Sequence, residues 1–246
     1  MAITNLAPLN RPLQRLASSP ALRPRVAVVD DNTVIRSGLP LLMAEFAFVG
    51  SFPDCESLLE RAPAADVVLL DLHLAGTGRT GIHQGVDAVR ACAAAGYRVC
   101  LYSNERRRHL LLRCLQAGAQ GVVHKADPAE TLAEAVFQVA AGSVVITTGL
   151  IGLAELAERR DRLPTLTDRQ RQVLSGRARG ETFRSIARRL AISEKTAQEH
   201  WSVVTEKFAG YLRTHSAADL EHQLGLDSGE LFPADHEVDW WRDHAR

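Results

Sequence analysis

A short apolar run that ends on a single carboxylate constrains the fold of this chain more than any other feature. Residues 67–70 read Val-Val-Leu-Leu, Asp71 follows them directly, and a glycine-rich loop comes next. An apolar run of this length between turn residues predicts a strand that is buried on both faces of a parallel sheet. In open α/β sheets, ligands bind just beyond the carboxyl ends of the strands. Asp71 is therefore expected where chemistry takes place, although this run alone would favour a solubilising residue at a strand end, and only the other strand ends overturn that interpretation.

Three other apolar runs also end on polar side chains. The groups that follow these runs are Asp30 with Asp31, then Ser103, and then Lys125. Because neighbouring parallel strands open on the same edge of a sheet, we expect these groups to lie beside Asp71. Clustered carboxylates repel one another unless a cation is present, and carboxylate oxygens suit Mg²⁺. A metal and a lysine together suit the transfer of a phosphoryl group.

Segments of strand and helix character alternate from residue 25 to about residue 142. Strands are predicted over residues 25–30, 48–52, 66–71, 98–103 and 120–124. Helices are predicted over residues 33–46, 54–62, 84–95, 105–117 and 128–141. Asp127 is expected to cap the last of these helices. The alternation predicts an α/β domain with a five-stranded parallel sheet and helices on both faces.

The segment from residue 164 to residue 224 is predicted to be entirely helical. Thr167 is followed three residues later by Gln170, which is the pattern of a capping box. Thr182, Ser193 and Ser216 are expected to cap three further helices. The four helices are predicted to end near residues 178, 190, 208 and 224. Two short helices across a tight turn are typical of a helix-turn-helix.

The two parts of the chain resemble two domains of one protein class. Residues 25 to about 142 resemble a response-regulator receiver domain, since the five polar groups occur in order at the expected strand ends. The string from Ile186 to His200, which includes Ile192-Ser193-Glu194-Lys195-Thr196, resembles a LuxR-type helix-turn-helix. Together they resemble the NarL/FixJ class of two-component response regulators. The resemblance implies a flavodoxin-like receiver followed by an all-α DNA-binding domain.

For the receiver, the resemblance implies a phosphorylation site. Asp71 would accept a phosphoryl group from a cognate histidine kinase, with Mg²⁺ as cofactor held by Asp30, Asp31 and Asp71. Lys125 would pair with the phosphoryl oxygens, and Ser103 would bond the phosphoryl group and move with it. The phosphoryl group adds a charge of about −2, which biases a loop that has two conformations.

For the second domain, the resemblance implies that the helix predicted over residues 194–208 enters the major groove of double-stranded DNA. Lys195 and Thr196 would contact phosphate. Positions that would read bases or flank them are Gln198, Glu199, His200 and Ser202. The preceding helix would run along the backbone with Arg184, Arg188 and Arg189, which gives a steep salt dependence. The expected binding form is a homodimer on two half-sites about one DNA turn apart.

Two departures from the family pattern keep alternatives open. The loop over residues 74–85 is longer than the family's and contains no proline, and Val122 stands where the family has an aromatic residue. The chain could therefore be a regulator of the same fold that a ligand or a partner controls, without phosphorylation. It could also be a protein-interaction module that no longer binds DNA, because Glu199 and an acidic tail oppose DNA binding. An enzyme is not expected, because no other strand end gathers a nucleophile, a base and oxyanion donors.

Charge is balanced over the whole chain but unevenly distributed along it. Residues 151–213 carry thirteen basic and eight acidic side chains, whereas residues 214–246 carry two basic and eight acidic ones. The predicted layout is a flexible extension at 1–24, a receiver at 25–142, a linker at 143–163, a LuxR-type domain at 164–224 and an acidic tail at 225–246. No apolar run is long enough for a membrane span or a signal peptide, so a cytoplasmic protein is expected. The four cysteines have no metal-type spacing and are expected to be reduced and packed.

Overall fold

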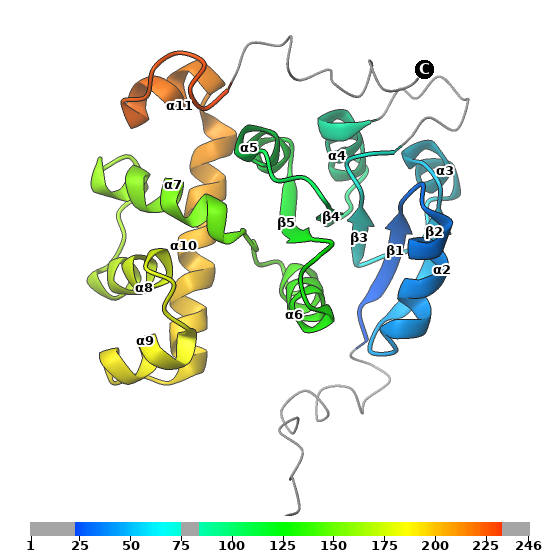
Figure 1. Cartoon of the computed structure of the whole chain (residues 1–246), viewed down its shortest axis with the longest axis horizontal. Helices are drawn as coiled ribbons and strands as arrows, with labels where there is room; N and C mark the ends of the chain where they lie inside the picture. The colour runs from blue at the N-terminus through cyan, green and yellow to red at the C-terminus, as the bar shows by residue number, and fades with distance from the viewer. Residues whose placement is uncertain (1–22, 75–83, 233–246) are drawn as a thin grey trace, which may run out of the picture.

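The computed structural model of this chain describes residues 23–74 and 84–232 (Figure 1). The predicted N-terminal extension, most of the long loop after Asp71 and the end of the acidic tail lie outside the described residues. None of the described helices is both long enough and apolar enough to cross a membrane.

A five-stranded sheet forms the centre of the N-terminal half. Its strands are β1 (Arg25–Val29), β2 (Ala47–Phe52), β3 (Val67–Leu70), β4 (Val99–Ser103) and β5 (Ala119–His124). All neighbouring pairs are parallel, and the spatial order is β2-β1-β3-β4-β5. This is the order of flavodoxin-like sheets, so the predicted fold is confirmed.

Five helices cover the two faces of this sheet. They are α2 (Thr33–Leu42), α3 (Cys55–Arg61), α4 (Gly85–Ala94), α5 (Arg108–Gln116) and α6 (Ala129–Ala140). Helices α3, α4 and α5 pack on the face to which Ala27 and Val29 of β1 point. Helices α2 and α6 pack on the opposite face, with Val26 and Val28. The strands are buried on both sides because successive side chains point to opposite faces.

Helix α2 is four residues shorter than predicted. Pro40 has no N–H for the carbonyl of Arg36, and that carbonyl instead accepts a hydrogen bond of 3.4 Å from the Ser51 hydroxyl of β2. The chain leaves the helix at Leu42, and Met43 and Phe46 turn into the core.

One predicted helix start and one predicted helix cap are wrong, and in both places a carboxylate accepts other backbone N–H groups. Helix α5 begins at Arg108 and not near residue 105, because the Glu105 carboxylate accepts hydrogen bonds from the N–H groups of Arg106 and Arg107. Asp127 does not cap α6, because its carboxylate accepts the N–H of His124 at 3.0 Å.

The segment between the two domains is more ordered than the sequence suggested. Val145 forms a parallel bridge with Gly121 of β5. The linker sequence predicts a short charged helix over residues 150–162, and the observed helix α7 (Thr148–Arg159) begins two residues before that. Leu150, Ile151 and Ala154 are fully buried, and α7 packs on α8. Gly149 and Gly152 lie inside this helix, because its apolar face is buried against a neighbour.

The C-terminal half is all helical, as predicted. Its helices are α8 (Asp168–Ala178), α9 (Phe183–Leu190), α10 (Glu194–Thr214) and α11 (Ala217–Leu224). Side chains of the four predicted capping residues accept backbone N–H groups at the helix starts, and the capping box at α8 is confirmed. Helix α10 runs six residues past its predicted end, because Ala209, Tyr211 and Leu212 continue its buried stripe.

Candidate functional site

Asp71 lies directly after β3 and is 6% exposed. Its Oδ1 accepts hydrogen bonds from the Ser103 hydroxyl at 2.6 Å and from the N–H of His73 at 3.3 Å. Its Oδ2 accepts a bond of 2.5 Å from the Lys125 ammonium. The carboxylate is thus held by groups from the ends of β4 and β5, which are the strands that the sequence predicted to open on this edge.

Lys125 connects two of the three predicted carboxylates. Its ammonium lies 2.7 Å from Asp30 Oδ2, in addition to its bond with Asp71. Burial lowers the pKa of Lys125, but the hydrogen bonds and charges of Asp30 and Asp71 more than offset this and leave the pKa raised. Burial also raises the pKa of Asp30, and the bond from Lys125 only partly opposes this. The site therefore favours a second cation beside the ammonium.

The three aspartates fit a metal ion. One carboxylate oxygen each of Asp30, Asp31 and Asp71 lies within 4.8 Å of the others. The Arg36 guanidinium donates to the backbone carbonyls of Asp30 and Asp31, at 2.6 and 2.8 Å, and so fixes the turn that carries them. A set of oxygen ligands with a cluster of negative charge is the donor chemistry that Mg²⁺ prefers.

The structure adds the side chains of a histidine and a glutamate to this site, whereas the family resemblance implies only the backbone carbonyl of His73, as a further metal ligand. His73 Nδ1 lies 3.4 Å from the Ser103 hydroxyl, and its Nε2 lies 3.3 Å from Glu105 Oε2. Burial tends to raise the pKa of Glu105, but hydrogen bonds from His73 and Arg107 hold it well below its ordinary value. Both residues stand two positions after a strand-end residue that was predicted, and this spacing is the signal that could have found them.

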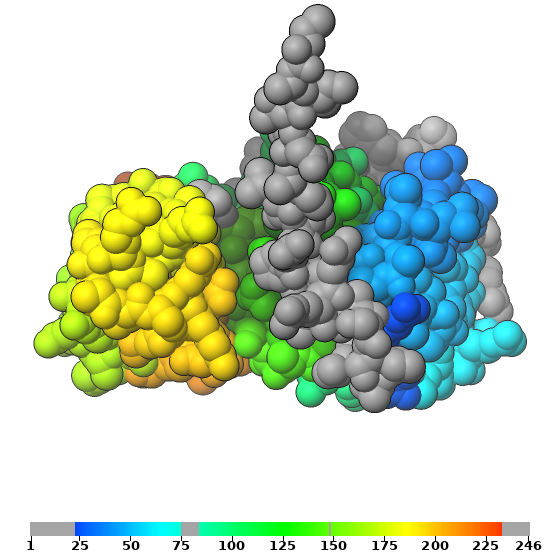
Figure 2. Space-filling view, turned by 90° about the horizontal axis from the view of Figure 1, so that it is seen from below, coloured from blue at the N-terminus to red at the C-terminus, as the bar shows by residue number. Residues whose placement is uncertain are grey.

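The helix-turn-helix consists of α9 and α10. Ala191 joins them with a left-handed backbone (φ 53°). The predicted DNA-contact residues that are exposed are Arg184, Arg188, Arg189, Lys195, Gln198 and Glu199, whereas Thr196, His200 and Ser202 are partly buried. In the space-filling view, the yellow residues of α9 and of the start of α10 gather at one end of the molecule, away from the blue first strand and helix (Figure 2).

Helix α10 lies between its own domain and the receiver (Figure 1). Its Ser202 hydroxyl is 2.8 Å from that of Ser143, which follows α6. Further along, the Gln116 amide of α5 donates to the carbonyls of Leu212 and His215, at 3.1 and 3.0 Å. One predicted base-reading residue therefore contacts the receiver side of the molecule.

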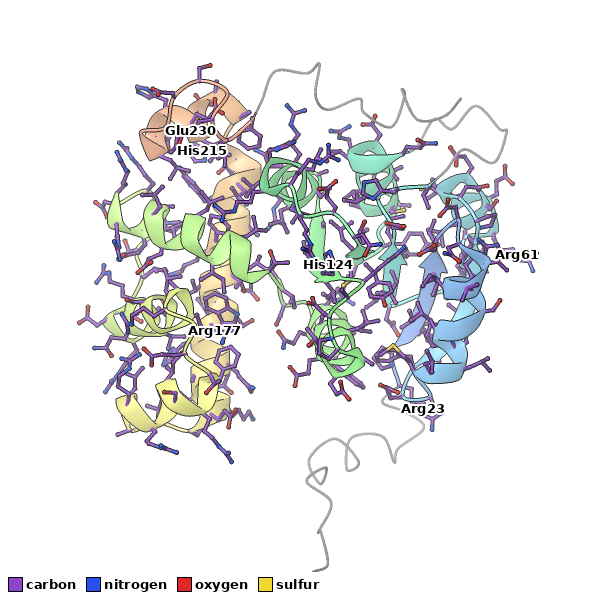
Figure 3. The ribbon with its side chains drawn as sticks, viewed as in Figure 1. Arg23, Arg61, His124, Arg177, His215 and Glu230 are labelled. Carbon is purple, nitrogen blue, oxygen red and sulfur yellow. The ribbon has the colours of Figure 1, made fainter. Side chains whose placement is uncertain are left out.

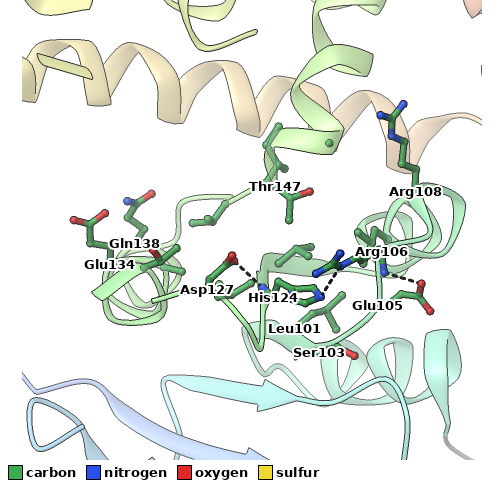
Figure 4. A pocket seen from close by; sticks show the side chains of 18 of the residues that line it. Leu101, Ser103, Glu105, Arg106, Arg108, His124, Asp127, Glu134, Gln138 and Thr147 are labelled. Carbon is green, nitrogen blue, oxygen red and sulfur yellow. Dashed lines mark hydrogen bonds between the residues drawn. The ribbon is translucent and has the colours of Figure 1, made fainter. Parts of the chain in front are cut away.

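A cavity of about 570 Å³ lies between the receiver and the helical domain (Figure 4). Ser103 and His124 line it from the receiver, and Arg177 and Trp201 line it from α8 and α10. Figure 3 labels His124 and Arg177 on the two sides of this boundary. The Arg177 guanidinium stacks on the Trp201 ring, and its Nε is buried with no hydrogen-bond partner among the described residues.

The chain after α11 packs back on its own domain as far as residue 232. The Glu221 carboxylate accepts hydrogen bonds from the N–H groups of Gly229, Leu231 and Phe232, at 3.0, 3.0 and 2.7 Å. Arg113 of α5 lies over the Phe232 ring at 5.9 Å. The start of the predicted tail is thus a bound segment that also contacts the receiver.

The sheet order, the carboxylate edge with its lysine, and the attached helix-turn-helix define a response regulator with a DNA-binding output domain. A model of the luxR family of bacterial regulatory proteins matches residues 164–220. The nitrate/nitrite response regulator protein NarL of Escherichia coli K12 is 29% identical over 203 residues, covering 78% of this chain and 92% of its own length. The DNA-binding transcriptional activator DevR/DosR of Mycobacterium tuberculosis is 30% identical over 205 residues, covering 78% and 92%. Among solved structures, the response regulator ChrA of a heme-sensing two-component system is 24% identical with a TM-score of 0.43, and the match covers 83% of this chain and 99% of that one.

The chain belongs to the NarL class of transcriptional response regulators, in which a receiver is joined to a LuxR-type DNA-binding domain.

Proposed function

We propose that Asp71 is the phosphoacceptor of this regulator and that a histidine kinase is the donor. The observation that carries the proposal is the set of bonds from Ser103 and Lys125 to the buried Asp71 carboxylate. In the reaction, a carboxylate oxygen of Asp71 attacks the phosphorus, and the bond from phosphorus to the donor histidine nitrogen breaks. Asp30, Asp31 and Asp71 would hold Mg²⁺, which offsets charge on the transferred group when bound.

The residues around Asp71 have separate tasks in this proposal. Lys125 carries a full charge at the end of a flexible side chain, so its ammonium can move to the phosphoryl oxygens once the Asp71 carboxylate is phosphorylated. Ser103 donates its hydroxyl to Asp71 before the reaction and can donate to a phosphoryl oxygen afterwards. Ser103 ends β4 and Lys125 directly follows β5, and these strands lead into α5 and α6, so movement of the two residues would reach the surface on which α10 packs.

We further propose that phosphorylation frees α10 from the receiver. The hydrogen bond between Ser143 and Ser202, together with those from the Gln116 amide, keeps α10 against the receiver, which would stand in the way of an approaching DNA duplex. A change at Ser103 and Lys125 alters the α5 and α6 surface and weakens these bonds. The freed domain would then dimerise and bind two half-sites about one DNA turn apart.

The proposed DNA contacts divide into two kinds. Arg184, Arg188, Arg189, Lys195 and Thr196 would bind phosphates, and Gln198, Glu199, His200 and Ser202 would face base edges or flank them. Glutamine can pair with adenine, and glutamate can accept a hydrogen bond from cytosine. Because Glu199 repels phosphates, this surface would bind DNA of arbitrary sequence more weakly but distinguish sequences more sharply. The exposed ion pair of Lys195 and Glu199, at 4.0 Å, would open on binding.

The test of the acceptor uses acetyl phosphate as the donor. The purified chain is incubated with acetyl phosphate and Mg²⁺, and intact-mass spectrometry measures the addition of one phosphoryl group. We expect addition to the wild type, no addition to Asp71→Asn, and normal addition to the control Asp87→Asn, which changes an exposed aspartate of α4. Equal addition to wild type and Asp71→Asn would overturn the assignment.

A second candidate is control by a small ligand, which the interdomain cavity favours. The cavity joins Ser103 of the acceptor site to Arg177 and Trp201 of the helical domain, and the buried Arg177 Nε is ready to donate to an anionic group. The probe is 8-anilinonaphthalene-1-sulfonate, an aromatic anion. Saturable binding that Arg177→Leu abolishes and Arg179→Leu retains would support the candidate. Binding that both variants retain would remove it.

A further inference from the structure

Two cysteines of the receiver are in direct contact. The sulfur atoms of Cys55 and Cys92 are 3.4 Å apart, and both side chains are fully buried. Cys55 is the first residue of α3, and Cys92 lies in α4. The two helices pack side by side on the same face of the sheet (Figure 1). This pair is therefore a dithiol that joins two separate segments of the chain.

The other two cysteines differ from this pair. Cys100 and Cys114 are also free and buried, but no hydrogen bond links either of them to another sulfur in the described chain. Burial raises the pKa of Cys100 to about 12 and also raises that of Cys114, and neither has a second thiol within hydrogen-bond distance in the described chain. The chain thus supplies its own controls for the reactivity of a buried cysteine.

We propose that Cys55 and Cys92 form a redox site, at which a hydroperoxide oxidises the two thiols to a reversible disulfide. One thiolate attacks the peroxide, its sulfur takes one oxygen as a sulfenic acid, and an alcohol or water leaves. The second thiol then attacks this sulfur, the S–S bond forms, and water leaves. The two electrons pass to the peroxide, and a dithiol reductant restores both thiols.

The geometry suits this reaction. A disulfide has an S–S distance of about 2.05 Å, so the sulfurs must approach by only about 1.4 Å. The hydrogen bond between the thiols lets one sulfur carry the proton while the other becomes the thiolate. This bond from Cys55 lowers the pKa of Cys92, even though burial opposes the shift. A peroxide is small enough to enter during local opening of the two-turn helix α3.

The position of the cysteine pair connects it to the edge of the sheet that carries Asp30 and Asp71. Cys55 lies three residues after Phe52, whose carbonyl accepts the N–H of Asp30 at 3.1 Å. Helix α4 follows the loop that leaves Asp71, and it packs on α5. A disulfide would tie the two segments that flank the acceptor and would restrain their movement. Resting on the proposed function, we expect the oxidised chain to accept a phosphoryl group more slowly.

The test treats the full-length chain with hydrogen peroxide, blocks free thiols by alkylation and maps linked peptides by mass spectrometry without reduction. We expect the loss of two hydrogen atoms from the intact mass and a linkage between residues 55 and 92, both reversed by dithiothreitol. Cys92→Ala should lose the linkage, and the double variant Cys100→Ala/Cys114→Ala should keep it. Asp71→Asn should also keep it, which separates this site from the acceptor proposal.

Two results would overturn the proposal. One is a folded wild-type chain in which peroxide leaves all four thiols free or drives Cys55 and Cys92 to sulfinic acid without a linkage. The other is a disulfide that forms but leaves the rate of phosphorylation by acetyl phosphate unchanged, in a chain that otherwise accepts the phosphoryl group at Asp71. Because the linkage is mapped in the wild type, the test holds even if a variant fails to fold.

Discussion

At the residue scale, the edge of the sheet that carries Asp71 holds more negative than positive charge. Three aspartates face one another, and one ammonium bonds two of them while being largely buried itself. Such a group of carboxylates is stable only while positive charge stays among them. A divalent cation bound here would offset this excess negative charge, and also the charge that a transferred phosphoryl group adds.

Removal of the lysine tests this arrangement. Lys125→Ala leaves Asp30 and Asp71 buried without their cation, so we expect the free energy of unfolding to fall by about 3 kcal/mol. Mg²⁺ should recover part of the loss, because it replaces the missing charge. Urea unfolding with and without Mg²⁺ measures both effects, with the exposed Lys195→Ala as control. Equal stability of Lys125→Ala and wild type without metal would contradict this account.

Glu105 predicts how stability depends on pH. Its pKa is lowered in the folded chain from an ordinary value of 4.5, so its contribution is complete above that pH and is lost as the pH falls below it. Glu105→Gln should lower the unfolding free energy at pH 7 by about 1–3 kcal/mol. It should also flatten the decline below pH 4.5 in denaturation curves. The exposed Glu130→Gln should follow the wild-type curve, and a Glu105→Gln curve as steep as wild type would refute the assignment.

The sequence predicted which residues lie around Asp71, because the strand ends of a parallel sheet share one edge. Asp71, Ser103 and Lys125 could be placed together from that rule alone. The side-chain contacts of His73 and Glu105 could not, because both residues lie in loops whose path depends on hydrogen bonds such as those that Glu105 accepts from Arg106 and Arg107. Loop side chains find their partners only once the backbone around them is fixed.

At the scale of elements, α10 belongs to two interfaces. Its N-terminal part carries the residues proposed to read DNA, and its C-terminal part contacts α5 of the receiver. The sequence predicted its start from the Ser193 cap but not its end, since the contact that buries Tyr211 and Leu212 comes from distant parts of the chain. A helix of 21 residues can transmit a change at one end to the other as a rigid body.

Loss of the Gln116 bonds should open the molecule without phosphorylation. Gln116→Ala removes two hydrogen bonds to the end of α10, which together stabilise the closed arrangement by about 1–2 kcal/mol. We expect DNA affinity in the absence of a phosphoryl mimic to rise by about five- to thirtyfold. Fluorescence anisotropy with a labelled duplex measures this. Gln138→Ala on α6 is the matched control. Unchanged affinity in Gln116→Ala would show that the Gln116 hydrogen bonds do not hold α10 against the receiver.

The basic face of α9 predicts the salt dependence of binding. Arg184 and Arg188 are exposed and would each neutralise one phosphate. Arg184→Ala and Arg188→Ala should each reduce the slope of log affinity against log salt by about 0.9 and weaken all sequences alike. Arg159→Ala, which changes an exposed side chain of α7, should leave the slope unchanged. An unaltered slope in both α9 variants would favour the protein-interaction alternative.

At the scale of the whole molecule, the chain is a closed two-domain regulator with contacts spread along one boundary. Ser143, Gln116 and Arg113 each reach across it, and the segment held by Glu221 extends the boundary beyond the helical domain. The sequence predicted both folds but treated the connection as loose, because α7 is buried only once α8 and, to a smaller extent, α5 pack against it. Relative placement of domains is a property of shared surfaces, and local patterns do not encode it.

The measurement that tests the central claim most directly is DNA affinity with and without a phosphoryl mimic. The duplex is first selected from a random pool by the chain treated with beryllofluoride and Mg²⁺, and affinity is then measured at one fixed salt concentration. If a phosphoryl group on Asp71 frees α10, beryllofluoride will tighten binding by the wild type and leave Asp71→Asn unchanged. If both chains bind with the same affinity in either condition, Asp71 is not the switch, and control through the interdomain cavity becomes the better account.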